Sequence, residues 1–259
     1  MARTTLVTQL HKIRTKIIRL GTLVETALEQ ALQAVQSSDQ VLCGLVIESD
    51  NTIDDVCSEV ERLAFQSLML QQPLAVDNLR FLSSAPSIAG DLERMGDNAE
   101  GIAKLLLRMA PLRNAGISQV HIDSSGMAKR DRRHPSDRMV TEASIVSGIV
   151  DLGQEARRVL QGVLRAFEQS DAQAARAIWQ EDDVVDVRYH LVRHDLMTML
   201  TDIHAIPALQ QDSLIMQRMT YWLWIAHNLE RIGDHCTKIC ERIVFLLEGE
   251  GAMRLTEEV

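Results

Sequence analysis

Hydrophobic side chains recur every three or four residues along most of the chain. The first stripe of this kind covers residues 6–35 and consists of Leu6, Leu10, Ile13, Ile17, Leu20, Val24, Leu28, Ala31 and Val35. This period is that of an α-helix with one face packed against other helices. Ser38-Asp39 follows and supplies a break and an N-cap for the next helix. The pattern predicts a long helix before residue 38.

Five more segments show the same period, so the prediction extends to the whole chain. Their stripes cover residues 46–63, 82–106, 140–167, 178–199 and 208–247. Ser170-Asp171 marks the start of the fifth predicted helix, as Ser38-Asp39 marks the start of the second. Each half of the chain therefore has three predicted helices, and the predicted fold class is all-α.

Residues 112–136 interrupt the helical pattern. They contain Gly116, Gly126 and Pro135, together with a basic cluster at 129–134. This composition is typical of an exposed linker, and a docking segment for an acidic partner or the inner membrane surface is the alternative. We predict three segments, which are a first bundle at 1–111, the linker at 112–136 and a second bundle at 137–259.

The composition argues against several classes of fold and function. Aromatic residues make up only 3% of the chain and Pro occurs five times, which argues against a sandwich or barrel of short strands. The formal charge of −9 argues against a general nucleic-acid binder. We expect no bilayer-spanning segment and no signal peptide, and the four cysteines lack CxxC spacing. These features favour a cytoplasmic protein with reduced thiols.

An internal repeat relates the two halves. Leu92-Glu93-Arg94-Met95-Gly96-Asp97 matches Leu229-Glu230-Arg231-Ile232-Gly233-Asp234 at five of six positions. The segments 50–54 and 182–186 both begin and end with Asp. Each matching pair occupies the same predicted helix of its half, so the halves are expected to share one architecture.

The repeat contains four pairs of acidic residues spaced four apart, which places both carboxylates of each pair on one helix face. The pairs are Asp50/Asp54, Glu93/Asp97, Asp182/Asp186 and Glu230/Asp234. Each lies beside the apolar stripe, where neighbouring helices can bring the pairs together. Four carboxylates without opposing Lys or Arg on that face need a cation. Oxygen ligands suit Mg, Ca, Mn or iron, with zinc a weaker candidate.

Other interpretations of these acids stay open. They are solvated surface residues if neighbouring helices do not bring them together. A ferritin-like di-iron site requires Glu-x-x-His motifs, and these helices have none. His227 and His235 flank the last acidic pair and are possible auxiliary metal ligands, although we favour surface or packing roles for both.

At the two Leu-Glu-Arg-Met/Ile-Gly-Asp segments, the sequence resembles the PhoU family of bacterial phosphate-signalling proteins. Gln72-Pro73 and Leu79-Arg80-Phe81 add to the resemblance, which covers both halves outside the linker. It implies two tandem three-helix bundles related by a pseudo-twofold repeat. It also implies a multinuclear metal cluster on each bundle, held by the two acidic pairs of that half, with Fe, Mn or Mg as the expected metals.

The resemblance further implies a cytoplasmic negative regulator of phosphate uptake and of the phosphate-starvation response. Such a protein links the Pst phosphate ABC transporter, through its ATPase, to a PhoR-type histidine kinase. It is peripheral to the membrane through these partners and often a homodimer. We expect no enzymatic activity, because the chain has no nucleophile–base constellation and no P-loop signature. The alternatives are an accessory subunit of another anion transporter and a di-metal carboxylate enzyme.

Overall fold

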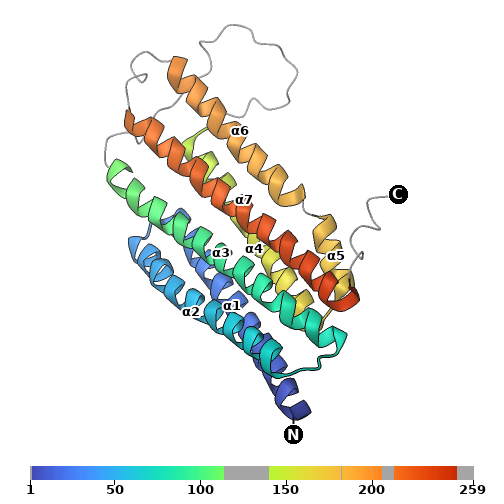
Figure 1. Cartoon of the computed structure of the whole chain (residues 1–259). Helices are drawn as coiled ribbons and strands as arrows, with labels where there is room; N and C mark the ends of the chain where they lie inside the picture. Colours follow the sequence, from blue (N-terminus) through green and yellow to red (C-terminus); the bar gives the residue numbers. More distant parts are fainter. Residues whose placement is uncertain (1, 114–139, 182, 206–212, 250–259) are drawn as a thin grey trace.

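The computed structural model describes residues 2–113, 140–181, 183–205 and 213–249. Within these ranges the chain forms seven α-helices and no strand, which confirms the all-α prediction (Figure 1). The helices are α1 (Ala2–Ser37), α2 (Gln40–Leu70), α3 (Val76–Arg113), α4 (Glu142–Gln169), α5 (Ala172–Gln180), α6 (Asp183–Ala205) and α7 (Ser213–Glu248).

The first helix of each half ends at the predicted Ser-Asp break. Ser38 and Ser170 adopt left-handed backbone conformations with φ of 63° and 55°. Asp39 then caps α2 by accepting a hydrogen bond from the backbone N–H of Val41 at 2.8 Å. Asp171 caps α5 in the same manner. The short carboxylate satisfies a backbone donor that has no partner inside the helix.

The second half differs from the prediction at its middle helix. The sequence predicts one helix there, whereas the structure has α5 and α6, which together occupy the place that α2 has in the first half. The backbone leaves the helix at Glu181, the C-cap of α5. Asp183 and Asp186 then lie in the first turn of α6, where the helix dipole favours negative charge. An acidic run is better accommodated at a new helix start than within one continuous helix.

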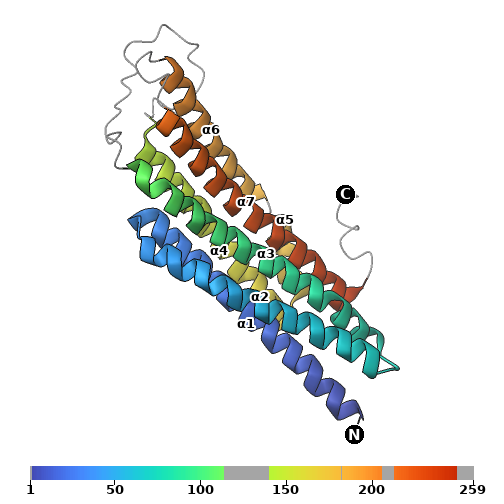
Figure 2. The ribbon, with the colours of Figure 1, turned by 60° about the vertical axis from the view of Figure 1, so that its left-hand side comes forward.

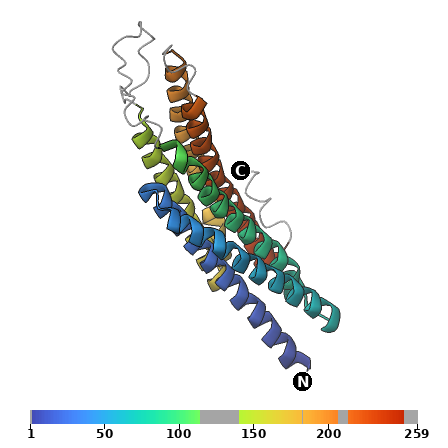
Figure 3. The ribbon, with the colours of Figure 1, turned by 90° about the vertical axis from the view of Figure 1, so that its left-hand side faces the viewer.

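The helices form one elongated assembly. In Figure 1, α3 and α7 lie side by side at the centre, α2 flanks α3, and α6 flanks α7. Helices α1 and α4 pack behind this row and contact each other. The helices share one long axis when the molecule is turned by 60° or 90° (Figures 2 and 3). A single buried core that includes Leu20, Leu92, Leu160 and Leu229 runs through both halves.

Reciprocal contacts between α1 and α4 reveal the pseudo-twofold relation. Gly21 of α1 lies so close to Leu164 of α4 that a Cβ atom at Gly21 would overlap with the leucine side chain. In the reverse direction, Gly153 of α4 lies against Leu32 of α1 with the same tightness. Gly153 follows Gly21 in the sequence by the same number of residues as Leu164 follows Leu32, so the two contacts are equivalent under the repeat. The two halves therefore meet through equivalent surfaces.

Helix α3 continues past residue 111 to Arg113. Residues 114–139, which make up most of the predicted linker and include its basic cluster, lie outside the described residues. The division into segments 1–111, 112–136 and 137–259 stays a prediction.

The tight glycine contacts predict a stability effect. Gly21→Ala and Gly153→Ala should each lower the free energy of unfolding by about 1–3 kcal/mol, because an added methyl group overpacks the helix contact. Gly44→Ala in α2 is the control, since a Cβ there meets nothing within 4 Å. Alanine at such a helical site should stabilise the protein by about 0.5–1 kcal/mol. Urea denaturation measures the free energy of unfolding of all three variants. Unchanged stability of Gly21→Ala would contradict the tight contact between Gly21 and Leu164.

Candidate metal centres

The first acidic cluster lies between α2 and α3, where a glycine allows close packing. A Cβ atom at Gly96 of α3 would lie 3.0 Å from two side-chain carbons of Ile53 on α2 and 3.7 Å from Oδ1 of Asp50. Ile53 directly precedes Asp54, and Gly96 directly precedes Asp97. The contact of Gly96 with Ile53 therefore brings the acidic pair of α2 to the acidic pair of α3.

The carboxylates of this first cluster repel one another. Burial, together with the charges of Glu100, Asp54 and Asp97, raises the pKa of Asp50 to about 6. Burial is also the largest cause that raises the pKa values of Glu93 and Asp97, and the charge of Asp54 contributes to both. All four predicted residues, Asp50, Asp54, Glu93 and Asp97, therefore belong to one electrostatic cluster.

One oxygen of this cluster is buried without a partner. Oδ1 of Asp50 accepts no hydrogen bond from any described residue. The charge of Lys104 lowers the pKa of Asp50, and the ammonium group of Lys104 pairs with Glu100. A buried carboxylate oxygen without a donor is costly. It fits a site that is completed by a hard cation.

Glu100 belongs to the cluster although the sequence reasoning missed it. Its charge raises the pKa of Asp50 more than the charge of any other residue does. The search for acids spaced four apart excludes Glu100, because it follows Asp97 by three residues. Residues three apart also share a helix face, so a search at both spacings would have found it.

The second cluster lies between α6 and α7. Asp186 of α6 and Glu230 and Asp234 of α7 each offer a carboxylate oxygen, and these three oxygens lie within 4.8 Å of one another. Gly233 again permits the approach, since a Cβ atom there would lie 2.9 Å from Cγ1 of Val185. Asp182, the fourth predicted residue of this centre, lies outside the described residues.

Two histidines near the second cluster have different surroundings. His235 is 4% exposed, and its Nδ1 lies 2.9 Å from Oδ1 of Asp91, which is 7% exposed. This hydrogen bond joins α7 to α3 across the two halves, so His235 has a packing role. His227 is partly exposed, and its Nδ1 lies 2.9 Å from Oε2 of Glu230. His227 therefore lies beside one of the three convergent carboxylates.

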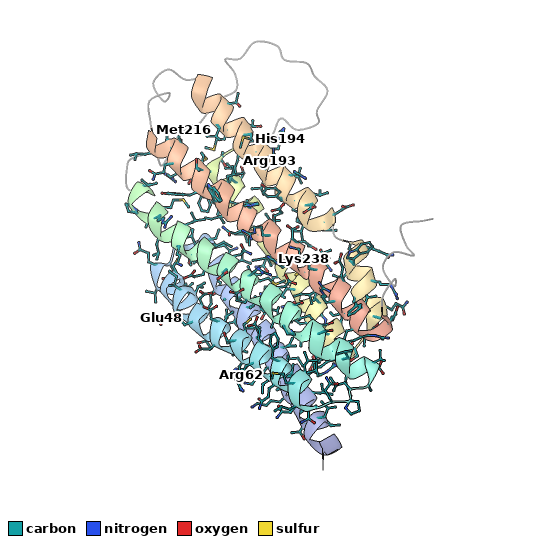
Figure 4. All side chains as sticks on the ribbon, viewed as in Figure 1. Glu48, Arg62, Arg193, His194, Met216 and Lys238 are labelled. Carbon is teal, nitrogen blue, oxygen red and sulfur yellow. The ribbon has the colours of Figure 1, made fainter. Side chains whose placement is uncertain are left out.

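The surroundings of the second cluster are aromatic and basic. The ring of His227 contacts Trp224 and Tyr189 at centroid distances of 6.3 Å. Burial and the nearby charge of Glu230 raise the pKa of Tyr189, whereas the charge of Arg193 lowers it. Figure 4 shows Arg193 on α6 and Lys238 on α7 among the side chains of this half.

Both clusters have the chemistry of a site for hard metal ions. They offer several carboxylates from two helices, and carboxylate oxygens are preferred ligands of Mg, Mn and Ca and common ligands of iron. The convergence of Asp186, Glu230 and Asp234 and the unpartnered oxygen of Asp50 both fit a bound cation.

Comparison with known proteins connects this arrangement to a family. The family model of the PhoU domain matches residues 17–106 and 149–243, one match in each half. The chain belongs to the PhoU family. The first match includes Glu93 and Asp97 of α3, and the second includes Glu230 and Asp234 of α7.

Curated PhoU relatives cover nearly the full length. A homolog of the phosphate-specific transport system accessory protein PhoU from Caulobacter vibrioides is 32% identical over 93% of this chain and 89% of that protein. The accessory protein PhoU of Escherichia coli K12 is 28% identical over 93% of this chain and 85% of that protein. These relatives are named as accessory proteins of a transport system.

Solved PhoU structures have the same fold. The crystal structure of the phosphate transport system regulatory protein PhoU from Streptococcus pneumoniae has a TM-score of 0.71 and 27% identity, and covers 95% of this chain and 98% of that chain. PhoU from Pseudomonas aeruginosa has a TM-score of 0.73 and 25% identity, and covers 93% and 98%. In the ranges that the structure describes, none of the helices combines the length and apolarity needed to cross a bilayer.

The raised pKa of Asp50 predicts how pH affects the metal-free protein. The folded pKa of about 6 lies above the unfolded value of about 3.9. The stabilising contribution of this group is therefore fully present below the unfolded pKa and is lost as pH rises from about 4 to about 6. Asp50→Asn removes the charge. Chelator-treated Asp50→Asn should therefore melt at a higher temperature than wild type at about pH 7.5, with a smaller difference at about pH 5.

The control for this prediction is Asp55→Asn, which changes an exposed neighbouring aspartate of α2. It should melt like wild type at both pH values. An Asp50→Asn variant that melts below wild type at about pH 7.5 would show that the Asp50 carboxylate is stabilised rather than strained.

Proposed function

We propose that this PhoU-family protein is a negative regulator of phosphate uptake and of the phosphate-starvation response. The observation that carries the proposal is the family match in both halves, combined with relatives that are named for the phosphate-specific transport system over nearly the whole chain. In this role the protein couples the ATPase of the Pst transporter to a PhoR-type histidine kinase in the cytoplasm. It acts as a homodimer and reaches the membrane only through these partners.

The proposed regulator has a metal centre in each half. The ligands of the first are Asp50, Asp54, Glu93 and Asp97, and those of the second are Asp182, Asp186, Glu230 and Asp234. The proposed metals are Fe, Mn or Mg. A bound cation would neutralise the repelling carboxylates and join α2 to α3, or α6 to α7, across the helix contacts at Gly96 and Gly233. Support comes from the unpartnered oxygen of Asp50 and from the converging oxygens of the second cluster.

We propose that the protein regulates without catalysing a reaction. Its relatives carry the name accessory protein, and a structure neighbour carries the name regulatory protein. In this proposal the metal ions hold pairs of helices in a fixed arrangement that the partner proteins recognise. Ions bound by several carboxylates are well suited to this role, because each carboxylate fixes the position of one helix.

Deletion of the gene from the native host tests the regulatory role. Transcription of phosphate-starvation genes should increase at high phosphate, because the signal from the transporter no longer restrains the kinase. Quantitative transcript measurement, with the intact gene restored as the control, checks this outcome. Unchanged transcription would contradict the proposal. Affinity capture from native membranes should recover the Pst ATPase, and capture of another anion transporter instead would favour the alternative assignment.

Replacement of one ligand in each centre tests the metal assignment. Asp97→Asn combined with Asp234→Asn should lower the bound metal to less than half of the wild-type stoichiometry, because ions held by carboxylates depend on ligand charge. Elemental analysis of the purified proteins measures the change. Asp55→Asn combined with Glu241→Gln, which alters exposed acids on α2 and α7, should leave the stoichiometry unchanged. Equal metal content in both double variants would refute the ligand assignment.

A further inference from the structure

The two acidic centres have different neighbours. His227 stands two residues before Leu229 in the second half, and the equivalent position before Leu92 in the first half is Gly90. A nitrogen donor is therefore available next to Glu230, whereas the position next to Glu93 has no side chain. The repeat provides an internal comparison, because the helix contacts at Gly96 and Gly233 are shared while this position differs.

The first centre, which lacks the histidine, has additional acidic neighbours that the second centre lacks. Glu100 follows Asp97 by three residues and acts on Asp50, whereas Thr237 holds the equivalent position after Asp234. Glu61 acts on Glu93 in the first centre, and Arg193 holds the equivalent position in the second. The first centre thus has more carboxylates, and burial together with the charges of Glu61, Glu93 and Asp54 also raises the pKa of the Cys57 thiol. The second has fewer carboxylates and an adjacent imidazole.

The position of His227 suits metal ligation. Its Nδ1 lies 2.9 Å from Oε2 of Glu230. Two donors that bind one ion at right angles, with bonds of about 2.1 Å, are separated by about 3.0 Å. Glu230 is also one of the three residues whose oxygens converge within 4.8 Å. An ion bound to Oε2 of Glu230 would therefore lie within reach of the imidazole.

Aromatic packing orients the imidazole ring. Trp224 contacts it edge-on with an interplanar angle of 71°, and Tyr189 of α6 contacts it at 44°. A contact between partly exposed residues of one helix turn contributes little stability by itself, even where both residues are charged. The two aromatic contacts hold the ring near Glu230, and a ring held in advance loses less conformational freedom on binding a metal.

We propose that His227 is a ligand of the second metal centre and makes the two centres unequal in metal preference. This inference rests on the proposed metal centres of the preceding section. Imidazole favours Fe, Co, Ni and Zn, whereas carboxylate and water favour Mg and Mn. The second centre should therefore retain a borderline transition metal in the presence of excess Mg²⁺, and the first centre should exchange such a metal more readily.

Pulsed electron paramagnetic resonance of bound Mn²⁺ tests the ligation, because it detects ¹⁴N that is coordinated to the ion. In the Asp97→Asn background, which weakens the first centre, Mn²⁺-loaded protein should show imidazole nitrogen modulation. His227→Gln should abolish the modulation and weaken Co²⁺ binding at the second centre about tenfold or more. His190→Gln is the matched control, since His190 is an exposed histidine that also contacts Tyr189, and it should retain both properties.

A transfer variant tests the same inference in the first centre. Gly90→His places an imidazole at the equivalent position, where a Cβ atom meets nothing within 4 Å. Combined with Asp234→Asn, it should introduce nitrogen modulation that Asp234→Asn alone lacks. This gain does not depend on whether the His227→Gln protein folds well.

The possible outcomes separate this inference from the proposed function. Bound Mn²⁺ without nitrogen modulation in the Asp97→Asn protein, or modulation that persists in His227→Gln, would overturn the role of His227 and leave the carboxylate centres intact. A wild-type protein that binds no Mn²⁺ or Co²⁺ would overturn the metal centres themselves, and the role of His227 with them.

Discussion

Two glycine contacts set the helix spacing on which the acidic surface depends. Gly96 allows α3 to approach Ile53 of α2, and Gly233 allows α7 to approach Val185 of α6. Each apolar partner directly precedes an aspartate, and each glycine does so too. Core packing therefore brings carboxylates from two helices together, although the carboxylates repel one another. The energy that opposes this repulsion comes from the buried apolar side chains beneath.

The unfavourable electrostatics fit a cation site better than a stabilising surface. Charged groups that served only solubility would lie apart on the exposed faces, where water screens them. Here Asp50 carries a raised pKa and a buried oxygen without a described donor. Strain of this kind is frequent at functional sites, where a ligand relieves it. A bound metal ion would neutralise the repelling carboxylates of two helices, so it would also strengthen the contact between these helices.

The sequence allowed prediction of the helices, the repeat and the acidic pairs, because each depends on local spacing. The Ser-Asp breaks were predictable for the same reason, since an N-cap acts within one turn. The division between α5 and α6 was not, because helical periodicity continues across Glu181. The hydrogen bond between Asp91 and His235 was also beyond prediction, since it joins helices from different halves. Glu100 could have been found as an acid three residues after Asp97, but its effect on Asp50 depends on which faces of α2 and α3 meet.

The two halves show which features the fold requires and which it leaves free. The reciprocal contacts of Gly21 and Gly153 join the two halves, and a larger side chain at either position would disturb the core. Gly90 and His227 hold equivalent positions in the two halves. The residue type can differ there without disturbing the helix packing, since the space at Gly90 is open and His227 is partly exposed. Positions beside the carboxylates can thus change while the helices stay in place. In the proposed metal centres, packing would determine where a cation binds, and the neighbouring side chains would determine which cation binds best.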